Sequence, residues 1–248
     1  MRLRIFIVVL IMFLSIGLFP SISSATAFNP LGQIGTDVSW PNCKAVPPIT
    51  LWGIVGVNDG LDFTVNPCAH KEANWFTHYG LYMNTGYPGI NYAEKYSNFP
   101  LQCTDQNKSC LAYNYGYAAA AFSLRYSALE SVHSNRWWLD VETVNSWSIS
   151  VNQNRDALEG MVAAIKSQTL LTKVGFYSNK TQWLAITGGW QNKDPNWVAT
   201  GALRSSEAQS ACIGQNFTGG GTLMTQYTNT LDQEYFCQTE PINYFLNN

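Results

Sequence analysis

Charged residues are scarce in this sequence. They make up 12% of its 248 residues, and the formal net charge is −2. A protein that binds the phosphate backbone of nucleic acids needs a basic surface, so this composition argues against nucleic acid as a partner. Histidines are also few: the chain has only His70, His78 and His133, and it contains no C-x-x-C or H-x-x-x-H spacing. We therefore expect no metal site and no cofactor.

Two other patterns are missing from the sequence. No serine lies in a G-x-S-x-G turn, which argues against a Ser-His-Asp hydrolase. After the first apolar run, no later run comes near the roughly 20 residues that a membrane span requires. The body of the protein is therefore not expected to cross a membrane.

The first 27 residues have the pattern of a signal peptide. Arg2 and Arg4 give a positive start, residues 5–19 are apolar, and Ala25 and Ala27 form an A-x-A cleavage site. We expect cleavage after Ala27 and one secreted domain over residues 28–248, extracellular or associated with a cell wall. The alternative is an uncleaved anchor, which the short apolar run disfavours. Loss of Arg2 and Arg4 takes the basic residues from 14 to 12 against 16 acidic ones, so the net charge falls to about −4.

Six cysteines behind a signal peptide predict three disulfides. The first two cysteines follow neighbouring strand patterns, the next two enclose a short polar segment, and the last two flank the final strand patterns. This order predicts the pairs Cys43–Cys68, Cys103–Cys110 and Cys212–Cys237.

Strand and helix patterns alternate along most of the chain. Apolar runs predict strands at 35–40, 52–57, 81–85, 136–143, 174–177, 197–199, 223–227 and 235–237. Helical patterns cover 67–78, 111–131, 152–167 and 181–186, and residues 90–109 have the character of a polar loop. The alternation predicts an α/β fold with a mostly parallel sheet, and eight strands in this length fit a compact TIM-like barrel.

The strand pattern at 136–143 ends in two carboxylates, Asp140 and Glu142. Side chains alternate along a strand, so these two acids point the same way, and each negative charge raises the pKa of the other. One protonated acid beside one ionised acid is the equipment of general acid catalysis. The alternative is that both acids face solvent at the end of a strand, because D-x-E is a common pattern.

Five short motifs occur in an order that resembles the family 25 lysozymes, the N-acetylmuramidases, and related glycoside-hydrolase-like domains. They are Gly35-Thr36-Asp37-Val38-Ser39, Leu139-Asp140-Val141-Glu142, Val174-Gly175-Phe176-Tyr177-Ser178, Trp197-Val198-Ala199, and Gln226-Tyr227-Thr228 with Leu231-Asp232. The resemblance spans nearly the whole chain after the signal peptide. It implies an irregular barrel with about five β-α units followed by three strands.

The resemblance also implies roles for individual residues. Glu142 would be the general acid, and Asp140 would position or stabilise an intermediate formed with the substrate's acetamido group. Asp37 and Asp232 would be the other two acidic residues of the catalytic site. Competing interpretations are an Asx-turn at Asp37, and a solvated turn or the nearby Glu234 in place of Asp232. The substrate-binding residues would be Tyr82, Tyr177, Trp197, Gln226 and Tyr227, although the aromatic ones are also ordinary core residues.

Two segments depart from the family pattern. Active lysozymes usually end the second strand in a segment like K-A-T-E-G and the third in Y-H-F, whereas this chain has Val57-Asn58-Asp59-Gly60 and Tyr82-Met83-Asn84. Both segments line the cleft in that family. The sequence therefore supports two main hypotheses. One is a wall hydrolase that cuts β-1,4 links of peptidoglycan or a related amino-sugar polymer, and the other is a non-catalytic glycan-binding protein. A third, weaker one is a glycosidase for a different sugar.

Overall fold

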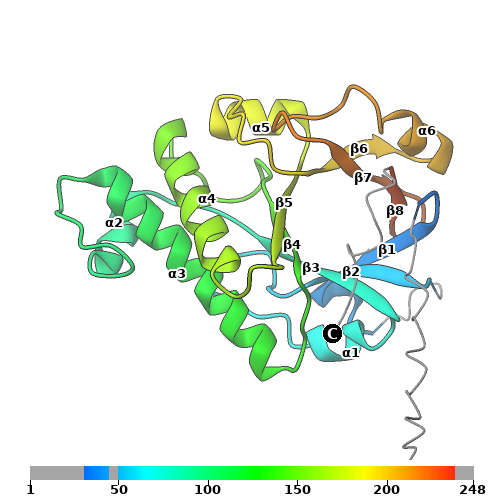
Figure 1. Ribbon diagram of the computed structural model, residues 1–248, viewed down its shortest axis with the longest axis horizontal. Coiled ribbons are helices and arrows are strands. Elements are labelled where there is room, and N and C mark those ends of the chain that lie inside the picture. Colours follow the sequence, from blue (N-terminus) through cyan, green and yellow to red (C-terminus); the bar gives the residue numbers. More distant parts are fainter. Residues whose placement is uncertain (1–30, 45–49, 238–248) are drawn as a thin grey trace, which may run out of the picture.

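The computed structural model describes residues 31–44 and 50–237, so the expected signal peptide and its cleavage site lie outside the described residues. Within this part of the chain, eight strands form a closed barrel in chain order (Figure 1). They are β1 (Ile34–Val38), β2 (Trp52–Gly56), β3 (His78–Asn84), β4 (Arg136–Asp140), β5 (Lys173–Ser178), β6 (Asn196–Ala202), β7 (Thr222–Thr228) and β8 (Asp232–Phe236). The predicted α/β barrel is confirmed.

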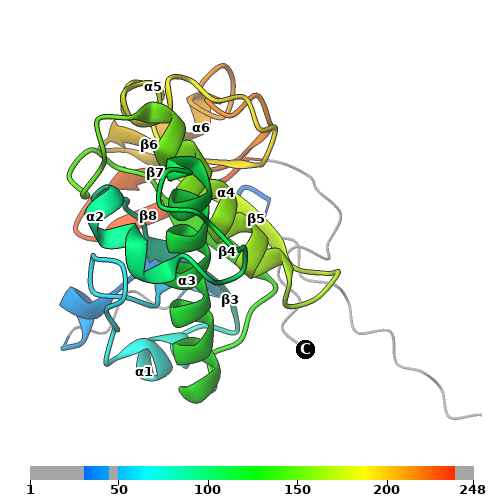
Figure 2. The ribbon, with the colours of Figure 1, turned by 90° about the vertical axis from the view of Figure 1, so that its left-hand side faces the viewer.

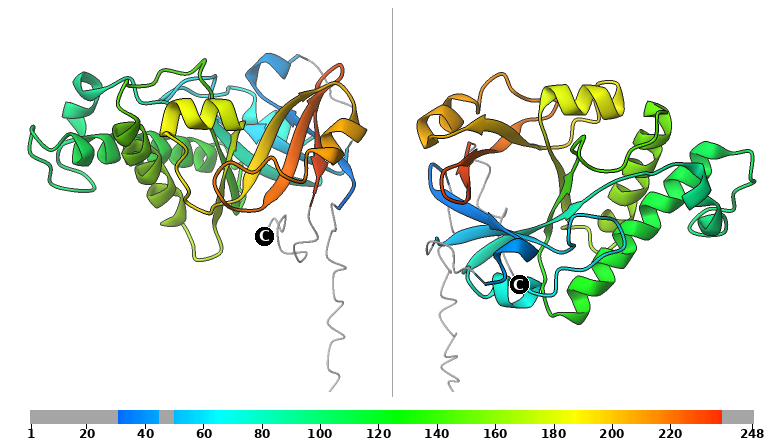
Figure 3. Two further views of the ribbon diagram at one scale, coloured as in Figure 1. Left: turned by 90° about the horizontal axis from the view of Figure 1, so that it is seen from above. Right: turned by 180° about the vertical axis from the view of Figure 1, so that it is seen from behind.

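All neighbouring strands from β1 to β7 pair in parallel. The last strand, β8, is antiparallel to both β7 and β1 and closes the barrel between them (Figure 3). A helix also lies between β6 and β7, so the parallel crossovers continue further along the chain than five β-α units would suggest. Only β8 reverses direction in the described part of the chain.

Helices connect most of the strands. They are α1 (Ala69–Ala73), α2 (Ile90–Ala93), α3 (Lys108–Leu129), α4 (Val151–Lys166), α5 (Lys180–Thr187) and α6 (Ser205–Ser210), with 3-10 turns η1 (Trp40–Asn42) and η2 (Glu94–Tyr96). The side chains of Asn107, Ser150 and Asn179 accept hydrogen bonds from backbone N–H groups in the first turns of α3, α4 and α5. These polar caps explain where the three helices begin. None of the helices that the structure describes is both long and apolar enough for a membrane span.

Side chains of the strands alternate between two apolar layers. The barrel interior is filled by large residues, among them Trp52, Trp138 and Phe236. The outer layer lies between the strands and the helices, and Trp137 and Leu139 belong to it. Neighbouring tryptophans of β4 therefore pack on opposite sides of one strand, as the pleat requires.

The two longest helices, α3 and α4, lie side by side on one flank of the barrel, which faces the viewer in Figure 2. Their backbones approach closely at two glycines. A Cβ on Gly116 would lie 1.8 Å from the carbonyl oxygen of Ala157, and a Cβ on Gly160 would lie 2.0 Å from that of Tyr113. Glycine has a low helix propensity, but at position 116 the absence of a side chain permits the close contact between the two helices.

Three elements differ from the expectations. The helix expected at 67–78 is only α1, because the chain turns after Ala73 and β3 begins at His78, three residues before the expected strand. After this turn the ring of Phe76 packs against Gly53 of β2, where a Cβ would lie 2.4 Å from it. The expected polar loop at 90–109 contains α2 and η2, and α6 lacks a recognisable helical pattern.

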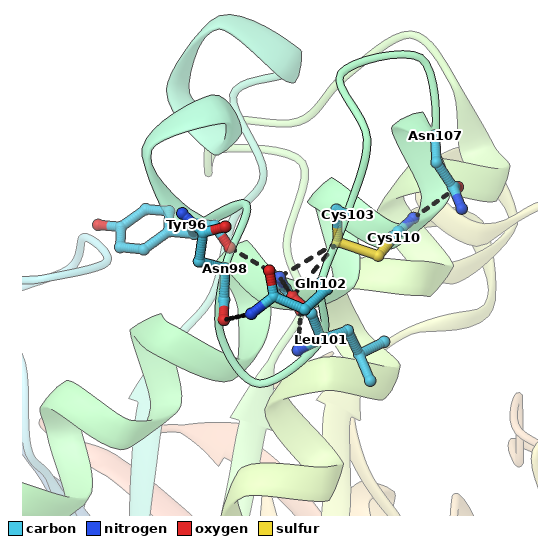
Figure 4. The surroundings of a disulfide bond; sticks show 8 residues. Tyr96, Asn98, Leu101, Gln102, Cys103, Asn107 and Cys110 are labelled. Carbon is cyan, nitrogen blue, oxygen red and sulfur yellow. Dashed lines mark hydrogen bonds between the residues drawn. A yellow bond between two sulfur atoms is a disulfide. The ribbon is translucent and has the colours of Figure 1, made fainter.

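All three predicted disulfides are confirmed: Cys43–Cys68, Cys103–Cys110 and Cys212–Cys237. Figure 4 shows the second, which ties the loop after η2 to the first turn of α3. The side chain of Asn114 fastens the same loop, since its Nδ2 donates to the carbonyl oxygens of Tyr96 and Leu101 at 2.7 and 2.8 Å. This loop is therefore a fixed part of the fold.

Candidate functional site

The carboxyl ends of the parallel strands meet at one mouth of the barrel, and the predicted acids lie there. Asp37 is near the end of β1, Asp140 ends β4, and Glu142 lies two residues beyond that end. Asp232 begins β8, and because β8 is antiparallel its beginning lies at this same end. We call the group of Asp37, Asp140, Glu142 and Asp232 the acidic mouth. Active sites of barrel enzymes lie at the equivalent face.

Asp140 is the most enclosed acid of this group, with 4% of its surface exposed. Its Oδ2 accepts a short hydrogen bond from Nδ2 of Asn84, the last residue of β3. Its Oδ1 is buried and has no hydrogen-bond partner among the described residues. Burial raises the pKa of Asp140 well above its usual range, and the charges of Glu142 and Asp37 add to the shift. The protonated form of Asp140 is therefore favoured.

A line of hydrogen bonds joins Asp37 to the far side of the mouth. Nε2 of Gln226 donates to Oδ2 of Asp37 at 3.2 Å, and the Tyr177 hydroxyl donates to Oε1 of Gln226 at 2.6 Å. Burial raises the pKa of Asp37 well above its usual value, and the charges of Asp232 and Glu142 raise it further. The side-chain amide of Gln226 thus holds both the Asp37 carboxyl of β1 and the Tyr177 hydroxyl of β5.

Glu142 is the partly exposed member of the D-x-E pair. Its Oε1 accepts a hydrogen bond from Nε2 of Gln182 in α5 at 3.3 Å. Its backbone carbonyl accepts from the Trp147 indole at 2.8 Å and from the Asn145 N–H at 3.1 Å, which fixes the turn that carries it. Because its charge raises the pKa of both Asp37 and Asp140, the three carboxyls form one electrostatic group.

Asp232 lies at the edge of the mouth, where the Thr228 hydroxyl donates to its Oδ1 at 2.7 Å. Two residues further along β8, Glu234 faces the same way and is completely buried. The Trp197 indole donates to its Oε2 at 2.5 Å. Burial and then the charge of Asp37 raise the pKa of Glu234 well above its usual value. The barrel thus holds a fifth acid, deeper than the other four.

The predicted aromatic residues divide into three kinds. Trp197 is 1% exposed and packs in the barrel interior, with its ring 4.5 Å from that of Tyr177 and 6.0 Å from that of Tyr82. Tyr82 keeps part of its surface exposed at the mouth. Tyr227 follows Gln226 along β7 and therefore points to the other face of the strand, away from the acids. The structure does not bring Tyr227 to the acidic mouth.

Two hollows lie at this end of the barrel. The smaller has a volume of about 180 Å³ and lies between Asp37, Tyr82 and Asp232. The larger, about 680 Å³, follows the ends of β5 and β6, and it is lined by Gln182, the residue that donates to Glu142. The larger volume is in the range of ligand sites, roughly 300–1,000 Å³. We call it the β5–β6 groove.

Residues 109–218 match a family model described as Lysozyme-like protein 1. The matched stretch contains Asp140, Glu142, Tyr177 and Trp197, and it stops before Gln226 and Asp232. This part of the chain is therefore similar to lysozyme-like proteins, which supports a glycoside-hydrolase-like function and a glycan as the substrate. No curated protein and no solved structure matches the chain.

The residues that the structure describes contain one cluster in which three possible metal-ligand atoms lie within 4.8 Å of one another. It consists of Cys43, Cys68 and Glu72. The two sulfurs are bonded to each other as a disulfide, so they cannot act as thiolate ligands. This cluster is not a metal site.

Two contributors to the site, Asn84 and Gln182, are not recognisable from sequence motifs, whereas a third, Glu234, is. Asn84 and Gln182 hold Asp140 and Glu142 by hydrogen bonds, yet each is an ordinary amide in a strand or a helix. Glu234 had a sequence signal, because it alternates with Asp232 and shares its face of β8. The hydrogen-bond partners of the acids depend on which elements lie next to each other in the fold, and no local sequence pattern predicts this arrangement.

Proposed function

We propose that this protein is a secreted glycoside hydrolase of the family 25 lysozyme type, which cleaves β-1,4 links of peptidoglycan or a related amino-sugar polymer. The observation that supports this most is the convergence of Asp37, Asp140 and Glu142 in one electrostatic group. Gln182, which donates a hydrogen bond to Glu142, also lines the β5–β6 groove. A protein that only needed to fold would gain nothing from crowding these carboxyls, because each makes ionisation of the others more costly.

In this proposal Glu142 is the general acid. It is the partly exposed carboxyl of the pair, and Gln182 connects it to the groove in which a glycan chain would lie. The leaving oxygen of a glycosidic bond must receive a proton, and a positioned carboxyl contributes about 10²–10⁴-fold to such a step. Gln182 orients Glu142 without neutralising it, because an amide carries no charge.

Asp140 lies beneath Glu142 and acts on the intermediate. Asn84 holds one of its oxygens, so the carboxyl has a fixed direction. A fixed carboxyl can accept a hydrogen bond from the substrate's acetamido N–H and orient that group for attack on the sugar carbon, the substrate-assisted variant of glycoside hydrolysis. Asp37 and its partner Gln226 close the other side of the mouth.

The proposed location is outside the cell that makes the protein. Three disulfides are typical of oxidising compartments. The signal-peptide pattern of the first 27 residues agrees with export. Peptidoglycan or a related wall polymer would be met there.

The test is the rate of reducing-sugar release from purified cell walls, measured together with melting temperature, for wild type, Glu142→Gln and Asp140→Asn. Glu142→Gln keeps the shape of the side chain and removes the proton donor, so activity should fall at least about 10²-fold. Asp140→Asn should also lower the rate strongly. Its amide oxygen can still accept the hydrogen bond from Asn84, so the side chain should keep its position. Glu142→Gln should melt at or above the wild-type temperature, because a crowded charge is gone. Asp140→Asn should melt near the wild-type temperature, because burial already favours the neutral form of this carboxyl.

Glu94→Gln is the matched control, since Glu94 is an exposed acid in η2, away from the acidic mouth. Its activity should equal that of the wild type. Full activity in Glu142→Gln would contradict the role of this residue as the acid. Inactivity of the wild type on every wall would contradict the hydrolase itself.

The second candidate is a glycan-binding protein without turnover. The observation that favours it is the closed character of the mouth: the hollow beside Asp37 measures about 180 Å³, and Asp140 is 4% exposed. The Asn58-Asp59 and Met83-Asn84 segments also depart from those of active lysozymes. Wall binding that persists in wild type and in Glu142→Gln, with no sugar released by either, is the result that this candidate predicts.

A further inference from the structure

A further cavity, of about 310 Å³, lies on the flank of the barrel, and none of the four acids of the acidic mouth lines it. Its walls come from the loops that follow β2, β3 and β4, and from α2, η2 and α3 (Figure 1). The volume is at the lower end of the range of ligand sites, roughly 300–1,000 Å³. We call this cavity the flank pocket. The side chains that line it include Asp62, Phe63, Tyr92, Tyr115 and Asn145.

Asp62 brings a carboxyl with one unsatisfied oxygen to the flank pocket. Its Oδ2 accepts a hydrogen bond from the Tyr115 hydroxyl at 3.1 Å. A Cβ on Gly86 would lie 3.2 Å from the same oxygen, so a glycine there leaves room for the carboxyl. Its Oδ1 is buried and has no hydrogen-bond partner among the described residues. Such an atom costs free energy, and a ligand group that supplied the missing hydrogen bond would recover part of it.

The loop that carries Asp62 is fixed by hydrogen bonds within itself. Nδ2 of Asn58 and the hydroxyl of Thr64 both donate to the carbonyl oxygen of Leu61, at 3.0 and 2.6 Å. The next residue, Phe63, has a φ of 60°, a left-handed conformation that is uncommon for a bulky side chain. Residues in such conformations are frequent at ligand sites, where the surrounding structure holds them. The fold therefore presents Asp62 and Phe63 to the pocket from fixed positions.

Aromatic rings form much of the wall. The ring of Phe63 stacks on that of Tyr96, with 5.4 Å between their centres, and meets that of Tyr115 edge-on at the same distance. The ammonium of Lys95 lies over the rings of Phe63 and Tyr96, 5.7 and 5.0 Å from their centres. Tyr92 differs from these packed rings because it is 59% exposed. The pocket thus combines apolar rings with a few polar groups, which is the usual composition of a ligand site.

We propose that the flank pocket binds one sugar unit of a glycan, outside the acidic mouth where the bond is cut. A sugar hydroxyl suits Asp62 in either protonation state, because it donates to a carboxylate and accepts from a carboxylic acid. The apolar face of the sugar ring would pack on the exposed ring of Tyr92. Asn145 and Ser146, which also line the pocket, supply further polar groups. The identity of the polymer rests on the proposed function, whereas the pocket itself does not.

The flank pocket shares a wall with the acidic mouth. Two residues that line the pocket, Thr85 and Asn145, donate hydrogen bonds to the backbone carbonyl of Asp140, at 2.5 and 3.4 Å. The carboxyl of Asp140 belongs to the acidic mouth. A glycan with one unit in the pocket would therefore be held close to the acids. Binding energy from a unit remote from the reaction contributes to holding and placing the substrate.

The test is an NMR titration with the monosaccharide N-acetylglucosamine, which contains no glycosidic bond and cannot be cleaved. The backbone amide signals of residues 60–63, 85–88 and 145–146 should shift together. Affinity should fall about tenfold in Tyr92→Ala, which loses the ring, and about fivefold in Asp62→Ala, which loses a hydrogen bond. The matched controls are Tyr113→Ala and Asp59→Ala, because neither residue lines the pocket. Both should stay within about twofold of wild type.

A second measurement uses cell walls as the substrate. If the protein hydrolyses walls, Tyr92→Ala should raise KM about tenfold and leave kcat within about twofold of wild type, because the ring binds a unit that does not react. The two measurements separate this proposal from the proposed function. A wild type that binds the monosaccharide in the pocket but releases no sugar from walls would contradict the hydrolase and support the pocket.

Two results would overturn the proposal. One is an absence of shifts in the three pocket segments, and the other is a loss of affinity in the controls as large as in the pocket variants. Melting temperatures identify a variant that fails to fold. Tyr92→Ala then carries the test, because an exposed ring contributes little to the fold.

Discussion

Asp62 is a carboxyl outside the acidic mouth that the fold has buried. Its Oδ2 accepts a hydrogen bond from the Tyr115 hydroxyl at 3.1 Å, and the Gly86 N–H also favours its charged form. Burial outweighs both contacts and raises the pKa of Asp62 to about 8. In the unfolded chain the same carboxyl ionises near pH 4. The folded state therefore binds one more proton than the unfolded state over the range between these values.

This difference in proton binding predicts the direction of a pH effect. Stability falls with pH wherever the folded state binds more protons, so the Asp62 contribution is complete below about pH 4 and is lost as pH rises toward 8. Asp62→Asn cannot ionise, and its amide oxygen can still accept from Tyr115. Between pH 5 and pH 8 this variant should lose less unfolding free energy than wild type, by at least about 1 kcal/mol.

Urea unfolding at the two pH values measures this difference. Asp59→Asn is the matched control, because Asp59 is an exposed acid in the same loop. Its pH dependence should be that of the wild type, which includes the contributions of Asp37, Asp140 and Glu234. If Asp62→Asn also follows wild type, Asp62 is not held protonated in the folded protein.

At the scale of elements, the contact between α3 and α4 makes a prediction that helix propensity alone would give with the opposite sign. Alanine favours a helix over glycine by about 1 kcal/mol. At position 160, however, a Cβ would lie 2.0 Å from the carbonyl oxygen of Tyr113. Gly160→Ala should therefore push the helices apart and lower the unfolding free energy by about 1–3 kcal/mol.

Chemical unfolding of Gly160→Ala and of Glu159→Ala tests this. Glu159 is the adjacent exposed residue of α4, and its replacement should change stability by no more than about 0.5 kcal/mol. If Gly160→Ala has a higher unfolding free energy than wild type, then the contact between α3 and α4 can accommodate the additional Cβ, and the prediction is wrong.

The elements also show what a sequence can and cannot predict. The strands β2, β4 and β5 are continuous apolar runs and were recognisable, as were the disulfide pairs, which follow from the order of the strands. The chain beyond the early end of α1 packs Phe76 against Gly53 of β2, a contact that no local sequence pattern predicts. The acids Asp37, Asp140 and Glu142 could be named from short motifs. Gln226 could also be named from its motif, but its contact with Asp37 could not be predicted, because it crosses 189 residues of chain. Asn84 and Gln182 could not be named as partners of the acids, because their contacts cross 56 and 40 residues.

At the scale of the whole molecule, barrel closure depends on one reversed strand. β8 supplies Asp232 and Glu234 and is the pairing partner of both β1 and β7. The Cys212–Cys237 disulfide joins the residue after β8 to the connection that follows α6, across 25 positions of sequence. Cys103–Cys110 spans only seven positions and lies in the loop before α3.

Replacing Cys212 and Cys237 by serine should cost about 3 kcal/mol, and replacing Cys103 and Cys110 should cost somewhat less, because a shorter loop loses less entropy on closure. The first pair of substitutions should also speed amide hydrogen exchange in β8, whereas the second should leave exchange there unchanged. Exchange monitored peptide by peptide separates the two. Equal protection of β8 in both variants would mean that strand pairing alone keeps the barrel closed.

The contact between Asp37 and Gln226 has a consequence for how the protein comes into being. The two residues stand 189 positions apart. A ribosome that adds about 5–20 residues per second needs roughly ten to forty seconds to pass from one to the other. Throughout that interval the nascent chain carries Asp37 and later Asp140 and Glu142, but not the residues of β7 and β8 that complete their surroundings. Any hydrolytic activity would thus arise only when synthesis is nearly finished, and an unfinished chain would be harmless to the cell that makes it.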